Sequence, residues 1–224
     1  MSAVRRVDVA TRSGQVRIVG GPAGGVEVRG GTVVQGAEGQ VSVTPDRPSS
    51  RVEIRCPAGC DVVVGTGSGA VELVGPLGDV RVTTGSGRIE LERARRADLR
   101  TRSGRIAVGE CEGDCRIVTS SATVEIGRAG SAEVAARSGA VRAGRVDEAS
   151  VTTASGRVDL GKTAEGRVEV RSVSGSVRVA VPSGTRPRAL LRSRSGRVHC
   201  DCEPGSDGEI QVSTGTGSIR VECE

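Results

Sequence analysis

The chain has 224 residues, which is enough for one or two domains with a sizeable core. It contains no Phe, Tyr or Trp and a single histidine, His199. Without aromatic rings there are no base-stacking platforms for single-stranded nucleic acid and no surfaces on which sugar rings stack. One histidine also excludes His-rich zinc sites. The net charge of +5 at pH 7 is modest and both signs are interspersed, so composition does not indicate a dedicated nucleic-acid-binding protein.

The N-terminal residues lack the apolar stretch of a signal peptide, and no window reaches 18 apolar residues. We therefore expect no transmembrane segment and a cytoplasmic protein. A surface or envelope location is expected only with non-standard export or a different start of the chain.

The N-terminal part of the chain alternates apolar and polar side chains without a regular repeat, as at Val41 and Val43. A cap is physically needed in a stacked β-structure, because an open end is an unpaired sheet edge. We predict that residues 1–55 form irregular coils or such a cap. Residues 56–224 are predicted to form regular coils, and both parts to belong to one domain, 1–224.

The strongest signal is a Ser-Gly marker followed by an alternating strand, recurring every 17–21 residues from Ser68 onward. The ten markers are Ser13, Ser68, Ser86, Ser103, Ser121, Ser138, Ser155, Ser174, Ser195 and Thr216. Positions six and four residues before each marker, and three and five after it, are small or aliphatic, with mostly polar residues between them. This period of two is that of a strand with one buried face. Each marker and its two flanking strands are therefore predicted to form one coil of an all-β, single-stranded β-solenoid.

We expect each coil to stack on the coil before it in the sequence, about 4.8 Å away, so that equivalent side chains form rows. The spacing of 55 residues from Ser13 to Ser68 then corresponds to about three coils. The hydroxyl residue two positions before a marker is expected to donate a hydrogen bond to its equivalent in the next coil. The glycine after each marker is expected at positive φ, with Ala122 as an exception that is strained or turns differently.

The repeat T-x-S-G-x-V-x-V, preceded by V-x-I-x-C-P-A-G-C-D-V-V-V, resembles the bacterial putative-adhesin family. That family is a β-strand-repeat domain of unknown function, similar in appearance to the polymer-forming bactofilins. The resemblance is good across residues 50–224 and weaker before them. It implies a right-handed β-helix and an association with the bacterial surface or with envelope stress. It transfers no catalytic residues, because the family has none that are agreed.

Many polysaccharide lyases and hydrolases are β-helices, which makes such an enzyme the obvious catalytic alternative. Glycosidases need paired carboxylates on one face, and Glu72, Glu90, Glu125 and Asp159 recur at one outward offset. They alternate with alanine and arginine, as on an ordinary solvated exterior, and no aromatic residue is present to hold a sugar.

His199 is the one histidine-based catalytic base that the chain offers. Its expected neighbours one coil to either side, Arg178 and Arg220, favour a surface histidine. We therefore predict no catalytic residues, no cofactor and no metal site, and a polysaccharide lyase or hydrolase is the least favoured function.

Seven cysteines in a chain without a visible signal peptide are expected to be thiols. Cys115 and Cys200 fall at inward offsets, which favours inert core packing. Cys56 and Cys60, like Cys111 and Cys115, are separated by three residues, which is not the ligand spacing of a zinc knuckle.

Cys202 and Cys223 are the candidate disulfide. They occupy the same offset after markers that are 21 residues apart, so their Cα atoms are expected about 4.8 Å apart, within the range that a disulfide spans. We expect the pair to be reduced in the cytoplasm and to close under oxidising conditions, locking the last coil.

Eight arginines flank the Ser-Gly corner, one position before or two after a marker. They are Arg12, Arg88, Arg102, Arg105, Arg137, Arg157, Arg194 and Arg197. In a stack of coils they form a broken positive stripe along one edge, a candidate polyanion-binding site for nucleic acid, an anionic glycan or lipid headgroups. The alternative is that arginine is simply the solubilising residue of this chain and protects the edge.

The sequence thus predicts a non-enzymatic β-solenoid that acts as a structural or interaction module, adhesin-like or envelope-associated by resemblance. Two alternatives stay open: a polyanion-binding protein that uses the arginine stripe, and a bactofilin-like scaffold that polymerises end to end through uncapped coils. The expected partner is another copy of the chain, another protein or an anionic polymer.

Overall fold

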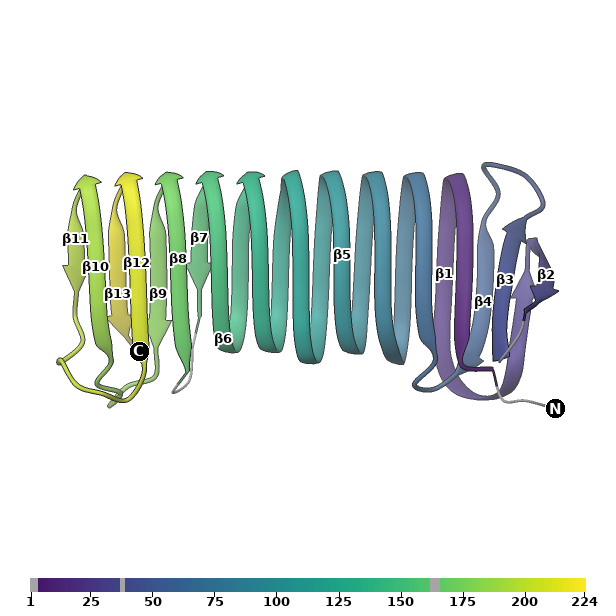
Figure 1. Cartoon of the computed structure of the whole chain (residues 1–224), viewed down its shortest axis with the longest axis horizontal. Helices are drawn as coiled ribbons and strands as arrows, with labels where there is room; N and C mark the ends of the chain where they lie inside the picture. The colour runs from purple at the N-terminus through teal and green to yellow at the C-terminus, as the bar shows by residue number, and fades with distance from the viewer. Residues whose placement is uncertain (1–3, 37–38, 162–165) are drawn as a thin grey trace. The chain divides into compact units, whose positions relative to one another are not determined.

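The computed structural model describes residues 4–36, 39–161 and 166–224. The elements that it labels are thirteen β-strands (Figure 1), in agreement with the predicted all-β class. No helix among the described residues is long and apolar enough to cross a membrane. The chain divides into two compact units, Met1–Glu112 and Gly113–Glu224, and the long strand β5 (Asp61–Ser138) contributes residues to both.

The first unit is built around strand β1. Its strands are β1 (Arg6–Arg29), β2 (Gly31–Gln35), β3 (Gln40–Pro45), β4 (Val52–Pro57) and the first part of β5. On one side β1 pairs in parallel with β5, where Val7 lies opposite Val62. On the other side it pairs in parallel with β3 and β4, where Val7 lies opposite Val41 and Val16 opposite Val52. The coil of β1 therefore lies between the first coil of β5 and a coil made of β3 and β4.

This arrangement differs from the predicted stacking in sequence order. Ser13 pairs directly with Ser68, so the 54 residues between them do not form three successive coils. They include instead the outer coil of β3 and β4, and the strand β2, which pairs antiparallel with β3. The prediction that the coils stack in the order of the sequence is therefore wrong. The inward rows of valine and isoleucine fit any neighbouring coil, so the repeat pattern alone does not specify which coil is adjacent.

The second unit contains the last part of β5 and eight further strands. They are β6 (Ala140–Ser155), β7 (Arg157–Leu160), β8 (Arg167–Ser174), β9 (Val177–Val181), β10 (Arg188–Ser195), β11 (Val198–Cys200), β12 (Glu209–Thr216) and β13 (Ile219–Cys223). Equivalent strands pair in parallel 17 or 19 residues apart, as Val124 does with Val141 and Val158 with Val177. The right-handed sense of the coils, the single-domain organisation and the strain at the Ala122 corner stay predictions.

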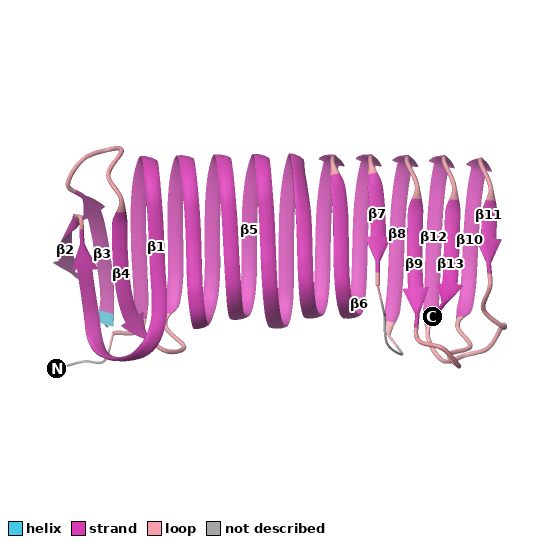
Figure 2. Cartoon of the chain, turned by 180° about the vertical axis from the view of Figure 1, so that it is seen from behind, coloured by secondary structure: helices cyan, strands magenta, loops and turns pink. Residues whose placement is uncertain are grey.

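The last two coils of this unit are also out of sequence order. Strands β8 and β9 pair with β12 and β13, where Val170 lies opposite Val212 and Val179 opposite Val221. Strands β10 and β11 pair with the other edges of β12 and β13. The coil of β10 and β11 is thus the outermost one, and the C-terminal coil lies inside it (Figure 2).

The predicted neighbours of His199 change with this order. His199 lies opposite Arg220, and Arg220 in turn lies opposite Arg178. The prediction that His199 lies between the two arginines is therefore wrong, because Arg220 is the middle residue of the row. His199 is exposed, as expected of a surface histidine.

The predicted alternation along each strand describes the core of both units. Thirty-six of the forty positions predicted to point inward are buried. The four exceptions, Ala189, Leu191, Val198 and Cys200, all belong to the coil of β10 and β11. A coil at the end of a stack has a neighbour on one side only, so its inward residues stay open to solvent. For this reason Cys200, predicted as inert core packing, is exposed.

The Ser-Gly corners confirm one prediction and correct another. All nine glycines that follow a marker have positive φ, for example +121° at Gly104. A Cβ atom at Gly104 would also lie 1.9 Å from the carbonyl oxygen of Gly87 in the adjacent coil.

Six threonine hydroxyls donate to the carbonyl oxygen two residues ahead in their own coil, as Thr101 does to Ser103 at 2.9 Å. The predicted bond to the next coil is wrong for these residues, because a local acceptor satisfies the hydroxyl without a second ordered side chain.

Ile219 and Val198 test the observed coil order, because they occupy the same offset in different coils. Ile219 is 1% exposed in the inner coil, whereas Val198 is 45% exposed in the outermost coil. We expect Ile219→Asp to lower the free energy of unfolding by about 3 kcal/mol or more, since it buries an unpaired carboxylate, and Val198→Asp to lower it by less than about 1 kcal/mol. Urea denaturation measures both values. The reverse ranking would mean that the coils stack in sequence order.

Candidate functional site

Positive charge is concentrated on the Ser-Gly corners. We define the corner edge of each unit as the residues from four before to three after each marker. Across the ten corners these eighty positions contain no Asp or Glu, although the chain has 27 acidic residues and an even spread would place about ten there. The same positions hold eleven arginines, so that the rest of the chain carries a net charge of −6. This segregation is visible in the sequence once the corners are aligned, and our sequence analysis missed it.

All eight arginines predicted to flank the corners are exposed. Within the described ranges, no ion pair or hydrogen bond reaches the guanidinium groups of six of them. These six are Arg12, Arg102, Arg137, Arg157, Arg194 and Arg197. Arg88, in contrast, contacts Glu90 at 3.2 Å. Most of the predicted stripe is thus charge without a partner in the described parts of the chain.

Many arginines outside the corner edge form ion pairs with acidic neighbours. Arg93 contacts Glu110 at 2.9 Å, and Arg116 contacts Glu133 at 3.7 Å. Such exposed pairs add little stability, but each offsets the charge of its arginine. Within the corner edge, Arg100 and Arg171 are paired in the same way with Asp98 and Glu169, so the guanidinium groups available there to an external anion are those without such a pair.

The coil order places several corner arginines in the same or adjacent coils. Arg102 and Arg105 share one coil, and Arg88 occupies the offset of Arg105 in the adjacent coil. Arg137 and Arg157 belong to adjacent coils at different offsets, where Arg157 lies opposite Ala140, and Arg194 and Arg197 share the outermost coil. The coils of Ser174 and Thr216, which lack arginine at these offsets, separate the third group from the second. The predicted broken stripe is thus a set of local clusters within each unit.

The four carboxylates considered for catalysis are all held in ion pairs. The contacts are Glu72–Arg17 (3.5 Å), Glu90–Arg88 (3.2 Å), Glu125–Arg142 (3.6 Å) and Asp159–Arg142 (3.8 Å). His199 contacts Asp201 instead, with Nε2 2.7 Å from Oδ1 at the surface. These groups have the environment of an ordinary charged exterior.

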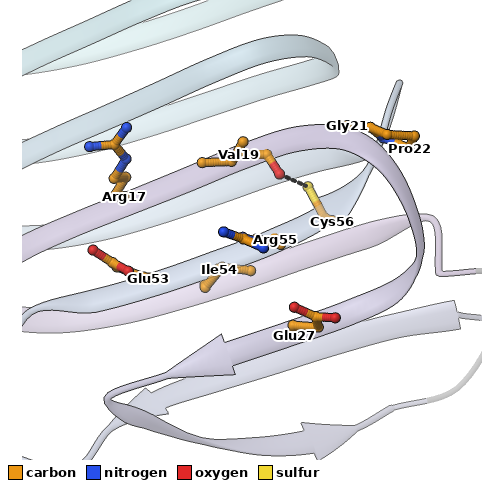
Figure 3. Close-up of a pocket in the computed structure, with 9 residues that line it drawn as sticks. All are labelled: Arg17, Val19, Gly21, Pro22, Glu27, Glu53, Ile54, Arg55 and Cys56. Carbon is orange, nitrogen blue, oxygen red and sulfur yellow. Dashed lines mark hydrogen bonds between the residues drawn. The ribbon is translucent and has the colours of Figure 1, made fainter.

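The first unit contains an open cavity of about 560 Å³ beside β4 (Figure 3). Arg17, Glu27, Glu53 and Arg55 line it with two positive and two negative charges. The sequence alone does not reveal this cavity, because its walls come from the second half of β1 and from β4, which meet only in the folded chain. The balanced charge of its lining favours no particular class of ligand.

Two buried thiols lie next to this cavity. A hydrogen bond between Cys56 and Cys60 lowers the pKa of Cys56, and the same bond together with burial raises the pKa of Cys60. Both residues are almost fully shielded from solvent, and of the two only Cys56 is among the described residues that line the cavity. In the parts of the chain that the structure describes, no three His, Cys, Asp or Glu side chains cluster closely enough to hold a metal ion.

Cys202 and Cys223 form a disulfide, and their Cα atoms lie 5.6 Å apart. Cys202 follows β11 and Cys223 ends β13, and these strands belong to adjacent coils in which Cys200 lies opposite Val221. The bond therefore ties the outermost coil covalently to the C-terminal coil, the two coils that are out of sequence order.

The stacked parallel strands, with rows of aliphatic side chains inside and Ser-Gly corners outside, define a β-strand-repeat domain. The chain belongs to the Toastrack DUF4097 family, whose profile matches residues 4–223. This membership confirms the resemblance to the putative-adhesin repeat family. The chain is also similar to a solved structure described as a putative cell adhesion protein from Clostridium sporogenes, at 9% identity over 100% of this chain and 94% of that chain, with a TM-score of 0.24. No match to a curated protein was found.

The disulfide is expected to stabilise the last two coils. It closes a loop of about 20 residues, for which loop entropy gives on the order of 3 kcal/mol. We expect a reductant to lower the urea midpoint of the protein, and Cys223→Ser to lower it equally and abolish the response to reductant. Cys200→Ser is the matched control, because Cys200 is an exposed free thiol of the same coil. A wild-type midpoint that is unchanged by reduction would contradict this role.

Proposed function

We propose that this chain is a non-enzymatic binding module whose corner edge holds an anionic polysaccharide. The observation that supports this proposal is the set of exposed corner arginines that no acidic residue contacts within the described ranges, on an edge without a single Asp or Glu. If the arginines served solubility alone, acidic residues could also occur at the eighty corner positions, as they do beside arginines elsewhere in the chain.

The chemistry of the corner edge suits a polymer that carries both charges and hydroxyl groups. A guanidinium group presents a planar fork of N–H donors that matches carboxylate and sulfate groups. Exposed hydroxyls at the same corners, such as those of Ser86, Ser155 and Thr216, add donors and acceptors for sugar hydroxyls. Because the chain lacks aromatic side chains, binding would depend on these polar contacts and not on stacking.

The absence of a catalytic step is part of the proposal. The carboxylates at the recurrent outward offset contact arginines, and His199 contacts Asp201 at the surface. These contacts engage the carboxylates and the histidine considered for catalysis with charged neighbours at the surface. The protein would bind its polymer without cleaving it.

Retention on immobilised heparin tests the proposal, because neutralised charge contacts release counterions and make binding depend on salt. We expect the wild-type protein to elute well above about 0.15 M salt. The triple variant Arg102→Gln, Arg137→Gln and Arg157→Gln should elute at clearly lower salt, since it removes three unpaired corner charges.

The matched control changes the net charge by the same amount on the strand faces. It carries Arg93→Gln, Arg116→Gln and Arg142→Gln, three arginines that are held in ion pairs. We expect the control to elute close to the wild type. Equal losses in both variants would show that only net charge matters, and elution of the wild type at or below about 0.15 M salt would refute binding. Stronger retention on immobilised duplex DNA than on heparin would reject the polysaccharide as partner.

A further inference from the structure

The outer end of the first unit is closed by antiparallel strands. Strand β2 covers the outer edge of β3, where Val33 lies opposite Val43. The last residues of β1 turn back along the outer edge of β4, where Val28 lies opposite Ile54. The covering strand is short and is interrupted at Gly30, which has φ of +79°. A short, bent and reversed edge is a poor template for a further coil.

The outermost coil of the second unit has no such cover. Within the residues that the structure describes, β10 pairs only with β12, and β11 only with β13. We call the outward edges of β10 and β11 the open end. Leu191 and Val198 point inward by their offset but stay partly exposed there, whereas their equivalents in inner coils are buried. The open end thus presents both unpaired backbone groups and an exposed section of the apolar core.

Charge divides the open end into two halves. The corner between β10 and β11 carries exposed Arg192, Arg194 and Arg197 and no acidic residue. The loop that follows β11 carries exposed Asp201, Glu203 and Asp207. Exposed Arg186 and Arg188 lie at the same extremity, before and at the start of β10, and Arg186 contacts Glu203 at 3.1 Å. The corner and the loop lie at opposite ends of the two strands (Figure 1). The open end therefore carries three arginines at one extremity and a small acidic excess, three carboxylates against two arginines, at the other.

We propose that the open end binds the open end of a second copy of this chain, with β10 antiparallel to the partner's β10 about a two-fold axis. In this orientation the arginine corner of each copy meets the acidic loop of the other. The alternative two-fold arrangement, which lays β10 on the partner's β11, would bring the two arginine corners together and is disfavoured by repulsion. The proposed polysaccharide binding concerns the whole corner edge, which includes Arg194 and Arg197. The two proposals are still tested separately, because the heparin experiment changes only Arg102, Arg137 and Arg157 and leaves the open end intact.

Because the second unit has an open end whereas the outer end of the first unit is capped, we expect a closed dimer and not a filament. A two-fold interface uses the same surface on both partners, so it is complete once two copies are joined. Growth would need a second free edge, and the outer end of the first unit is capped. The eight residues of β10 span about 26 Å at about 3.3 Å each, so the contact is at the small end of specific interfaces. We therefore expect association in the micromolar range.

Sedimentation of the full chain over low-micromolar to near-millimolar concentrations tests the proposal. The mass should rise from that of the 22.8 kDa chain to twice this value and then stay constant. Val198→Lys places an ammonium group in the open end, at a position already 45% exposed, and should weaken association at least tenfold. Val34→Lys, at a 57% exposed position of the capped end, is the control that should still dimerise. Unchanged melting temperatures show that both variants fold.

Charge reversal tests the orientation of the two copies. Arg194→Glu with Arg197→Glu makes both extremities acidic, and Asp201→Arg with Glu203→Arg makes both basic. Each double variant should lose the dimer alone, and an equimolar mixture of the two should recover it. A wild type that stays monomeric, a mass that grows beyond the dimer, or dimerisation unaffected by Val198→Lys or by either double variant would overturn the proposal.

Discussion

Each coil of this chain depends on the coils stacked against it, because a single coil of two short strands cannot bury its aliphatic side chains or satisfy its backbone groups alone. Parallel hydrogen bonds and rows of like side chains supply both needs at once. The corner glycines belong to the same constraint, since Gly104 approaches Gly87 too closely for any side chain. The solvent exposure of an inward-pointing residue therefore depends more on the position of its coil in the stack than on the type of side chain.

The first and the last strand of the chain each lie one coil inside an end of their unit. The coil of β1 lies between β5 and the coil of β3 and β4, and the coil of β12 and β13 lies between β8–β9 and β10–β11. A terminal strand with one free edge tends to fray, whereas a strand paired on both edges is held along its length. The outer coils are instead anchored by chain connections at both of their ends, and at the second unit also by the Cys202–Cys223 disulfide.

The sequence predicted the strands, the buried offsets and the positive-φ glycines, because each follows from local alternation or from one backbone requirement. It did not predict the coil order, because Val212 can pack equally well against Leu191 and against Val170. The exposure of Val198 and Cys200 depends on that order, so the sequence did not predict it either. For the candidate site it identified the corner arginines. Which of them have acidic partners depends on side-chain contacts between coils, and the cavity beside β4 depends on strands far apart in the chain.

Amide hydrogen exchange of the monomer at low concentration tests the coil order most directly, because protection reports how fully each strand is paired. The account predicts that β12 and β13 exchange more slowly than β10 and β11, although they include the C-terminal strand of the chain. Faster exchange in residues 209–223 than in residues 188–200 would place the C-terminal coil at the end of the stack and contradict the account.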